Sequence, residues 1–402
     1  MGGALARTVT DARESVMEIL LAEILHDTHC YEPGLDQRRP TLVASSVPKP
    51  RRLIRAGRER VRDVVERAAH SAGFARRHFD PNRAAERLQR LFELSDGLQA
   101  TYEALADEPS RRAMVDVLKL RVLGPYHCAV RLTPEVYRDK QAYADRALRT
   151  ARDTFAVSDP WFSPLSEYSV PVGDGSHVRL HSHSVDVVSV LLLEQYSYLQ
   201  SPDPVAAGPG DVVLDVGGCW GDTALYFAAR VGPEGKVYTF EFDPENLAIM
   251  RANLALNPAL APRIKVIERA LWDRSGELLQ FVQAGRMTTV VASGNRAQEV
   301  MTITVDDFVD EEQIDRVDFL KLDVEGAELN VLDGARRTLT SFTPSVGIAA
   351  YHKDDDLVQI PAALAATCAE YRFYLETFSA VEEETVVFAS RSRADATMAR
   401  TY

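Results

Sequence analysis

The sequence predicts an α/β protein with a doubly wound, mostly parallel sheet, preceded by a mostly helical region over residues 1–150. From residue 212 onward, short β-rich runs alternate with helical patterns, which is typical of a parallel sheet flanked on both faces. Two last runs are joined by only a few residues, and so short a link permits an antiparallel hairpin but no parallel crossover. A glycine-rich turn directly follows the first run.

The composition fits a soluble globular protein of more than one domain. The chain has 402 residues, of which 46% are hydrophobic, an ordinary share for chains with packed cores. It contains no apolar stretch long enough to span a bilayer, and its first residues lack the apolar core of a secretory signal, so we expect a cytoplasmic protein without membrane contact. The four cysteines show no CxxC spacing, which predicts reduced, buried thiols and neither a zinc site nor disulfides.

Charge is unevenly distributed along the chain. The net charge is −13, yet basic residues outnumber acidic ones in the first 150, mainly between Arg38 and Arg90. This segment could attract an acidic carrier protein, a phosphorylated substrate or nucleic acid. Because acids are interleaved and aromatic residues for base stacking are few, a solvated helix face is the favoured interpretation, and we expect no nucleic-acid partner.

The elements follow in order along the chain. Apolar residues at helical spacing predict helices over residues 13–27, 52–70, 84–106 and 110–122. Residues 151–205 are expected to be a proline-containing linker, then a strand and a helix leading into the core. The sheet domain, 206–395, is predicted to contain parallel strands at 212–216, 236–241, 264–268, 317–322 and 345–350, a helix at 357–369, and a hairpin of 371–378 and 385–389.

The first strand and its turn, "VVLDVGGCWG", predict a cofactor site. Ligands of doubly wound sheets bind at this turn, where Gly217 and Gly218 leave the backbone accessible. Asp215 is expected to point into the crevice, where its carboxylate would repel a pyrophosphate but could receive hydrogen bonds from an ammonium group. The turn therefore favours S-adenosylmethionine over a nicotinamide dinucleotide.

Other residues complete the expected cofactor site. Glu241 ends the second strand, where an acid can accept both ribose hydroxyls. Trp220, inside the turn, could form a wall for the methionine portion, although core packing explains it equally well. Tyr196 is predicted to cover the cofactor as part of a lid. We also assign Phe242 and Ala270, which follow the second and third strands, to this site.

Asp323 follows the fourth strand beside the same crevice. It could orient an acceptor hydroxyl, act as a base or bind a metal ion. Glu325 is more simply explained as stabilising a helix N-terminus. A Mg²⁺ site made from Asp323, Glu325 and Asp354 is conceivable because hard cations prefer carboxylates, but it is not favoured, and no metal is assigned.

These motifs closely resemble the FkbM family of S-adenosylmethionine-dependent methyltransferases. The resemblance extends from roughly residue 178 to 390 and rests on "DVVLDVGGCWGDTALYFA", "KVYTFEFDPENL", "RALWDRSGE", "VDFLKLDVEGAELNVLDGA", "YHKDDDLVQIP" and "EETVVFAS". It implies a Rossmann-like class I methyltransferase fold, with a seven-stranded sheet and a terminal antiparallel hairpin. It also implies cofactor roles for Asp215, Gly217 and Glu241, an active-site role for Asp323, and methylation of a small-molecule hydroxyl, such as that of a sugar or natural product.

The histidines raise two further hypotheses. A base within hydrogen-bond reach would activate the acceptor hydroxyl, and His352, which follows the fifth strand and belongs to a residue type that titrates near neutrality, is the first choice. A structural role is its alternative. His181 and His183 alternate on an expected strand and could bind a metal or gate the pocket, but structural roles are favoured for both.

The function expected from these observations is S-adenosylmethionine-dependent O-methylation of a small molecule. An N-methyltransferase, an NAD-dependent oxidoreductase and a non-catalytic binding partner in a biosynthetic assembly remain as alternatives. Residues 1–150 are expected to cover the substrate or to form a homodimer contact.

Overall fold

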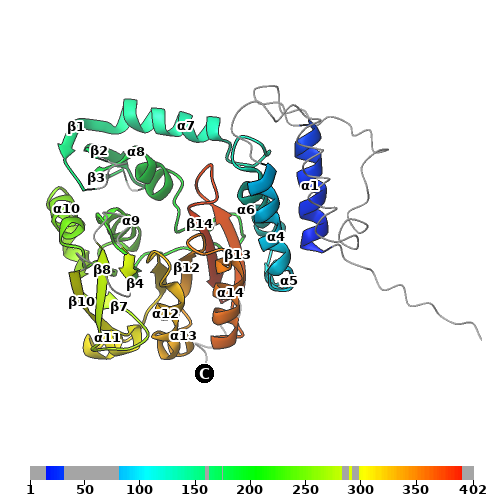
Figure 1. The fold of residues 1–402 in the computed structure, drawn as a ribbon. Helices are drawn as coiled ribbons and strands as arrows, with labels where there is room; N and C mark the ends of the chain where they lie inside the picture. The colour runs from blue at the N-terminus through cyan, green and yellow to red at the C-terminus, as the bar shows by residue number, and fades with distance from the viewer. Residues whose placement is uncertain are drawn as a thin grey trace, which may run out of the picture. The chain divides into compact units, whose positions relative to one another are not determined.

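A seven-stranded sheet forms the centre of the computed structural model, which describes residues 15–30, 81–158, 163–173, 175–282, 289–291 and 298–391 (Figure 1). Its strand order is β13-β14-β12-β11-β4-β5-β6. All neighbouring pairs are parallel except those of β14, which is antiparallel to both β12 and β13. The strands are β4 (Val212–Val216), β5 (Lys236–Phe240), β6 (Ile264–Ile267), β11 (Phe319–Leu322), β12 (Ser345–Ala349), β13 (Arg372–Thr377) and β14 (Thr385–Ser390).

This order confirms the predicted fold class. The five parallel strands and the terminal hairpin lie where the sequence pattern put them, within two residues at each end. In the terminal hairpin, the later strand β14 lies next to β12, and the earlier strand β13 forms the edge of the sheet. The carboxyl ends of β4, β5 and β11 consequently share the centre of one sheet edge, next to the point where the strand order reverses.

Helices cover both faces of the sheet. Val213 and Phe319 are register partners on one face, and Phe319 packs against Phe227 of α9 at 5.4 Å between ring centroids. Phe240 lies on the opposite face, where it meets Phe308 of α11 edge-on at 4.7 Å. The near-continuous apolar strands follow from this burial on both sides.

The helices of this region follow the strands in alternation. Asp243 caps α10 by accepting a hydrogen bond from the amide of Glu245 at 2.8 Å, as the sequence "DPEN" predicts. The helices are α8 (Ser184–Asp186), which continues into a π-helical turn (Val187–Leu192), α9 (Asp222–Val231), α10 (Pro244–Ala255), α11 (Val305–Glu311), α12 (Glu328–Asp333), α13 (Arg336–Phe342) and α14 (Asp356–Thr367).

Two smaller sheets were not predicted. The expected linker contains β1 (Arg149–Phe155) and β2 (Leu165–Pro171), and β2 pairs with both β1 and the predicted strand β3 (His177–Ser182). A four-stranded sheet of order β7-β10-β8-β9 lies between β6 and α11, with β7 (Ala270–Leu271), β8 (Leu278–Val282), β9 (Thr289–Val291) and β10 (Gln298–Ile303). Prolines and short, irregular apolar spacing hid these strands from the sequence pattern.

The N-terminal region is helical where it is described, with α1 (Val16–Cys30), α4 (Pro81–Glu93), α5 (Ser95–Ala104), α6 (Glu108–Leu123) and α7 (Pro134–Tyr143). The described residues up to 99, namely 15–30 and 81–99, form a compact unit with 118–129. The buried Lys119 is held inside that unit by Glu23, at 3.4 Å, and by the carbonyl of Ala129, at 2.7 Å. The predicted helix 52–70 and most of the basic segment lie outside the described residues.

Two predictions from composition can be compared with the structure. None of the helices in the described ranges has both the length and the apolar character that a bilayer span needs. Cys128 is buried, whereas Cys219 and Cys368 are half-buried, and none of these three cysteines forms a disulfide.

Candidate active site

A cavity opens at the carboxyl ends of the central strands. It is lined by the turns that follow β4 and β5, residues 269–272 beyond β6, the end of β11, Tyr351 beyond β12, and Glu384 at the start of β14. A further wall comes from the segment 186–196, which precedes the sheet. The empty space measures about 1130 Å³, which includes the part open to solvent.

The glycine turn is shaped by contacts inside the protein. Gly217 has φ +81°, and a Cβ there would lie 1.8 Å from the carbonyl oxygen of Asp323. A Cβ on Gly218 would lie 2.0 Å from the hydroxyl of Thr239. Both glycines are required because neighbouring strand ends fill the space of a side chain. Gly217 lines the cavity, but Gly218 does not, so the expected backbone access for a ligand exists at Gly217 alone.

Asp215 does not line the cavity, contrary to the prediction from its position. Its carboxylate is fully buried and forms an ion pair with Lys321 at 3.3 Å. It also accepts hydrogen bonds from the hydroxyls of Thr223, at 3.0 Å, and Thr239, at 2.8 Å. A direct bond from Asp215 to a ligand ammonium group is therefore excluded in this arrangement, because its lone pairs face protein donors.

Lys321 links the first strand to the turn. Its ammonium group donates to the carbonyls of Val216, at 3.1 Å, and Gly217. Burial lowers the pKa of this group, but the carboxylates of Asp215, Asp323 and Asp222 outweigh that effect and the pKa is raised overall. The cation thereby fixes the turn at the cavity wall. The lysine inside the apolar run "DFLKLD" is the sequence signal for this role, which was not predicted.

Glu241 lies where the sequence predicts, at the cavity beyond β5. Its Oε1 atom accepts the amides of Phe242, at 2.6 Å, and Asp243, at 2.8 Å, and its Oε2 atom accepts from the side chain of Asn246 at 3.3 Å. Burial raises the pKa of Glu241 to about 7. These donors fix the orientation of the carboxylate at the cavity.

Further acids surround the cavity near the start of α9. Asp222 and Asp186 both line it. Burial raises the pKa of Asp222 to about 7, and the nearby carboxylate of Asp186 adds to the rise. Across the cavity, Glu384 accepts a hydrogen bond from Gln195 at 2.5 Å. None of these four residues was predicted, since their sequence spacing shows no relation between them.

The aromatic and small residues predicted for the site line the cavity, namely Trp220, Phe242, Ala270 and Tyr196. Phe242 packs edge-on against Phe281 of the unpredicted four-stranded sheet at 4.9 Å between ring centroids, and Ala270, in β7 of that sheet, belongs to the same apolar cluster. Trp220 is buried and donates a hydrogen bond to Asn246 at 3.0 Å. The same side chain therefore packs in the core and forms part of the cavity wall.

Tyr196 is not a lid. Its side chain is 1% exposed and lies with its ring 5.4 Å from the ammonium group of Lys321. Its hydroxyl donates to Oδ2 of Asp323 at 2.7 Å. Burial, together with the charge of Asp323, raises its pKa, so the phenol stays neutral and remains a hydrogen-bond donor.

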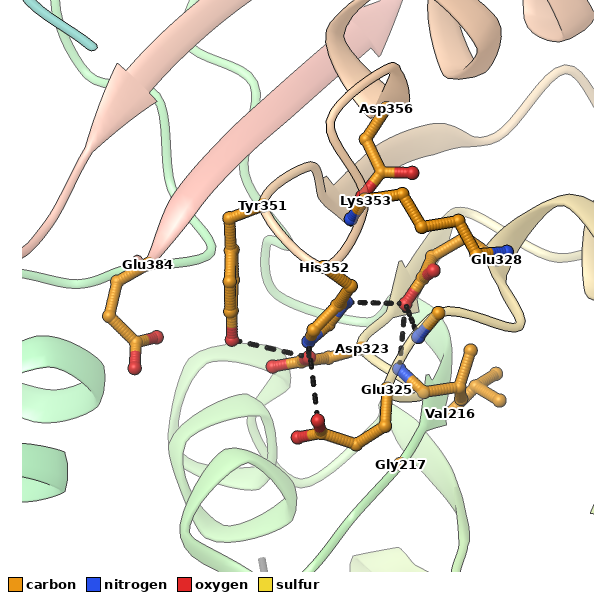
Figure 2. Close-up of polar contacts among 12 residues, drawn as sticks. Val216, Gly217, Asp323, Glu325, Glu328, Tyr351, His352, Lys353, Asp356 and Glu384 are labelled. Carbon is orange, nitrogen blue, oxygen red and sulfur yellow. Dashed lines mark hydrogen bonds and ion pairs between the residues drawn. The ribbon is translucent and has the colours of Figure 1, made fainter. Parts of the chain in front are cut away.

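Asp323 lines the cavity directly beyond β11, close to Tyr351 and His352 (Figure 2). While Oδ2 accepts from Tyr196, its Oδ1 atom has two more distant neighbours at 3.5 Å each, the hydroxyl of Tyr351 and Nε2 of His352. Oδ1 is therefore the oxygen with more capacity to accept a hydrogen bond from a ligand.

His352 is unsuited to the role of base. It does not line the cavity, and its Nδ1 atom contacts the Glu328 carboxylate at 2.9 Å. Burial lowers its pKa, but the hydrogen bond to Glu328 and the charges of Asp323, Glu328 and Glu325 raise it to about 9 overall. At neutral pH the ring is a cation, which has no lone pair to accept a proton.

The side chains that could together hold a metal ion differ from the Mg²⁺ site considered from the sequence, which combined Asp323, Glu325 and Asp354. Asp323, Glu325 and His352 bring one ligand atom each within 4.8 Å of one another, as do Glu328, His352 and Asp356. Asp354 belongs to neither group. A histidine cation between carboxylates satisfies this arrangement without a metal ion.

His181 and His183 do not form a pair. His181 ends its strand with Nδ1 2.9 Å from the hydroxyl of Thr154. His183 lies one residue beyond the strand and caps α8 by accepting from the amide of Val185. The favoured structural interpretation fits both contacts.

Comparison with known proteins identifies the sheet domain. Residues 208–380 match the model of the methyltransferase FkbM domain. A curated 2-O-methyltransferase, NoeI from Sinorhizobium fredii (strain NBRC 101917 / NGR234), is 28% identical over 163 residues, which cover 36% of this chain and 62% of NoeI. The chain thus spans less than two thirds of that relative.

A solved structure shares the fold. Methyltransferase FkbM from Methylobacillus flagellatus KT superposes with a TM-score of 0.50, at 16% identity, over 85% of this chain and 71% of its own. This similarity concerns the fold alone. The match to the domain model shows that residues 208–380 are a methyltransferase FkbM domain.

Proposed function

We propose that this protein transfers a methyl group from S-adenosylmethionine to a hydroxyl oxygen of a small molecule. The observation that carries the proposal is the placement of two oriented carboxylates in one cavity, Glu241 beyond β5 and Asp323 beyond β11. The FkbM domain and the likeness to a 2-O-methyltransferase support the same chemistry.

The charges of the cavity suit the proposed methyl donor. S-adenosylmethionine carries a sulfonium and an ammonium group, and when bound it supplies an electrophilic methyl group. Glu241, aimed by its backbone donors, would accept the ribose hydroxyls. Asp222 and Asp186 would face the positive charges, because opposite charges close together favour the ionised acid. A dinucleotide, whose diphosphate is anionic, would be repelled by the same acids.

Asp323 would bind the acceptor. Its Oδ1 atom is available to a hydroxyl, and the Tyr196 hydroxyl holds Oδ2 in place. The acceptor proton would pass to Asp323 while the new O–C bond forms and the S–C bond breaks. Base assistance of this kind typically contributes about 10²–10⁴-fold, and alignment of oxygen, carbon and sulfur contributes the rest.

Binding measurements test the cofactor. Calorimetry should register S-adenosylmethionine and its demethylated product, and no heat with NAD. Tight binding of NAD with no heat from the sulfonium compound would contradict the proposal.

Turnover then tests the acceptor class. Incubation with a panel of sugars and polyhydroxylated natural products should yield products heavier by one methylene, with the methyl on oxygen by NMR. A methyl on nitrogen would favour the N-methyltransferase alternative. Bound cofactor with no product across the panel would favour a non-catalytic partner. Activity should survive a chelator, because no step requires Mg²⁺.

The first 150 residues enter this proposal as acceptor cover or as a homodimer contact. A variant without residues 1–80 should keep cofactor affinity, because every residue that lines the cavity lies between positions 186 and 384. Its acceptor KM and its mass in solution would separate the two roles. Binding of a carrier protein through the basic segment would appear as salt-sensitive retention.

A further inference from the structure

His352, beyond β12, faces three acids of one short segment, residues 323–328, which joins β11 to α12. The imidazole is 8% exposed. Its Nδ1 atom contacts Glu328 at the start of α12, and its Nε2 atom faces Oδ1 of Asp323 at 3.5 Å and Oε2 of Glu325 at 3.8 Å (Figure 2). Nε2 has no hydrogen-bond partner within 3.5 Å in the described part of the chain. One ring therefore connects a buried glutamate to the acid that lines the cavity.

Glu328 is itself firmly held. Its side chain is 1% exposed, and Oε1 accepts the amide of Val324 at 3.1 Å in addition to its contact with His352. The amide of Gly326 points to the same oxygen from 3.4 Å. Burial raises the pKa of Glu328. The hydrogen bond and charge of His352, together with backbone hydrogen bonds, outweigh that effect, so the pKa is lowered overall. This carboxylate thus fixes both the ring and the turn that carries Asp323.

The turn has little freedom of its own. Glu325 has φ +52° and Gly326 has φ +95°, and a left-handed non-glycine residue persists only where its surroundings impose it. A Cβ on Gly326 would lie 3.3 Å from Cε of Lys353. The backbone beside Asp323 is therefore kept in a conformation that isolated residues rarely adopt.

We propose that Glu328 and His352 form a positioning pair, in which the imidazolium ring holds the Asp323 carboxylate in the orientation that receives the acceptor hydroxyl. This inference rests on the proposed function and goes beyond it, because it assigns His352 to the control of Asp323 and not to proton transfer. Neither residue lines the cavity, so both act through Asp323. The Tyr196 hydroxyl holds only Oδ2 of Asp323. Without the positive charge of His352 near Oδ1, the carboxylate could rotate while it keeps that hydrogen bond.

Other charged or titratable groups around the ring are few. The Tyr351 ring lies 4.2 Å from it between centroids. The Asp356 carboxylate, whose pKa burial raises to about 6, belongs to the cluster around His352 and Glu328. Lys353 is exposed on the same loop. A change of activity near pH 9 that is present in the wild type and absent from His352→Gln therefore reports on the positioning pair.

Three variants test the pair, namely His352→Gln, Glu328→Gln and the control Lys353→Gln. The control removes one positive charge from the adjacent residue, which does not line the cavity. We expect His352→Gln to lower kcat about 10²-fold, the typical effect of a small misplacement of a reacting group. Affinity for S-adenosylmethionine, measured by calorimetry, should stay at the wild-type value. Lys353→Gln should keep wild-type kcat.

The pH profile distinguishes positioning from a merely structural role. In the wild type, kcat should fall as pH rises through about 9, because the ring then loses the proton that attracts Asp323. His352→Gln should lack this limb, and Glu328→Gln should move it toward the ordinary histidine value of 6.5. A His352→Gln variant with wild-type kcat, or with an unchanged alkaline limb, overturns the proposal.

A measurement without turnover separates this inference from the proposed function. Imidazole NMR of the protein alone should show His352 protonated at pH 7.5, and its titration should move to lower pH in Glu328→Gln. If that shift occurs but no acceptor is ever methylated, the proposed function fails while the pair stands as a structural unit. If His352 titrates near 6.5 in the wild type, the pair is refuted whatever the activity.

Discussion

The buried ion pair of Asp215 and Lys321 makes a quantitative prediction about stability. The two side chains are 0% and 1% exposed, and their charged atoms lie 3.3 Å apart. Lys321→Met keeps most of the length of the side chain but removes its charge. It leaves Asp215 with two hydroxyl donors and leaves the carbonyls of Val216 and Gly217 without the ammonium group. Removal of one partner of a buried pair costs about 3–5 kcal/mol, a large share of the roughly 5–15 kcal/mol that stabilises a typical domain.

The reverse variant should cost less. Asp215→Asn leaves the Lys321 cation near Asp222 and Asp323, whose charges already favour it, so the loss should approach that of one charged hydrogen bond, about 1.5–3 kcal/mol. The double variant, Asp215→Asn with Lys321→Met, removes both charges, so neither is left buried without its partner. We expect its loss to be smaller than the sum of the single losses by roughly 0.5–3 kcal/mol, the usual range for residues in contact.

Urea unfolding monitored by tryptophan fluorescence measures these differences. Because Trp220 adjoins the turn, the signal reports on the region concerned. Losses that add without coupling would refute the interpretation of the two side chains as one unit. A Lys321→Met variant as stable as the wild type would refute it as well.

Three other outcomes are expected. Gly217→Ala should destabilise the domain far more than Gly210→Ala, because both have positive φ but only Gly217 also meets a carbonyl, that of Asp323, at 1.8 Å; equal unfolding midpoints would contradict this. Glu241→Gln should weaken binding of S-adenosylmethionine in calorimetry by about 1.5–3 kcal/mol, the value of a hydrogen bond to a charged group, and unchanged affinity would remove Glu241 from the site. The raised pKa of His352 contributes stability that is fully present below pH 6.5 and is lost as pH rises through about 9, on the order of 3 kcal/mol. His352→Gln should therefore flatten unfolding free energy against pH in that window.

The sequence predicted the large sheet because its strands are buried on both faces. Such strands appear as continuous apolar runs with clear ends, as in 212–216 and 345–350. The strands β1 and β2 escaped detection because their burial is irregular and Pro164 and Pro171 lie close to or within β2. The residue pattern thus identifies strands that are buried on both faces and misses a strand such as β1, which has no buried residue.

The candidate site was predictable in position but less so in role. Strand ends placed Glu241, Asp323 and Gly217 at the cavity correctly, because sheet topology alone decides which ends meet. The roles of Asp215 and His352 depended on partners far away in the chain, namely Lys321 and Glu328. A pairing over more than a hundred residues, such as that of Asp215 with Lys321, leaves no periodic trace in the sequence. Charged groups are especially prone to such errors, since a nearby opposite charge converts an apparent ligand or base into a structural ion.

The segment 186–196 also affects how this domain can be transplanted. The family match begins at residue 208, yet Ser189, Gln195 and Tyr196 contribute side chains to the cavity. A fragment that begins at residue 208 and continues through β14 would keep every strand of the large sheet but would lack this wall of the cavity. Chimaeras between related enzymes should therefore have their junction before α8, so that the sheet and the cavity wall formed by residues 186–196 are exchanged together.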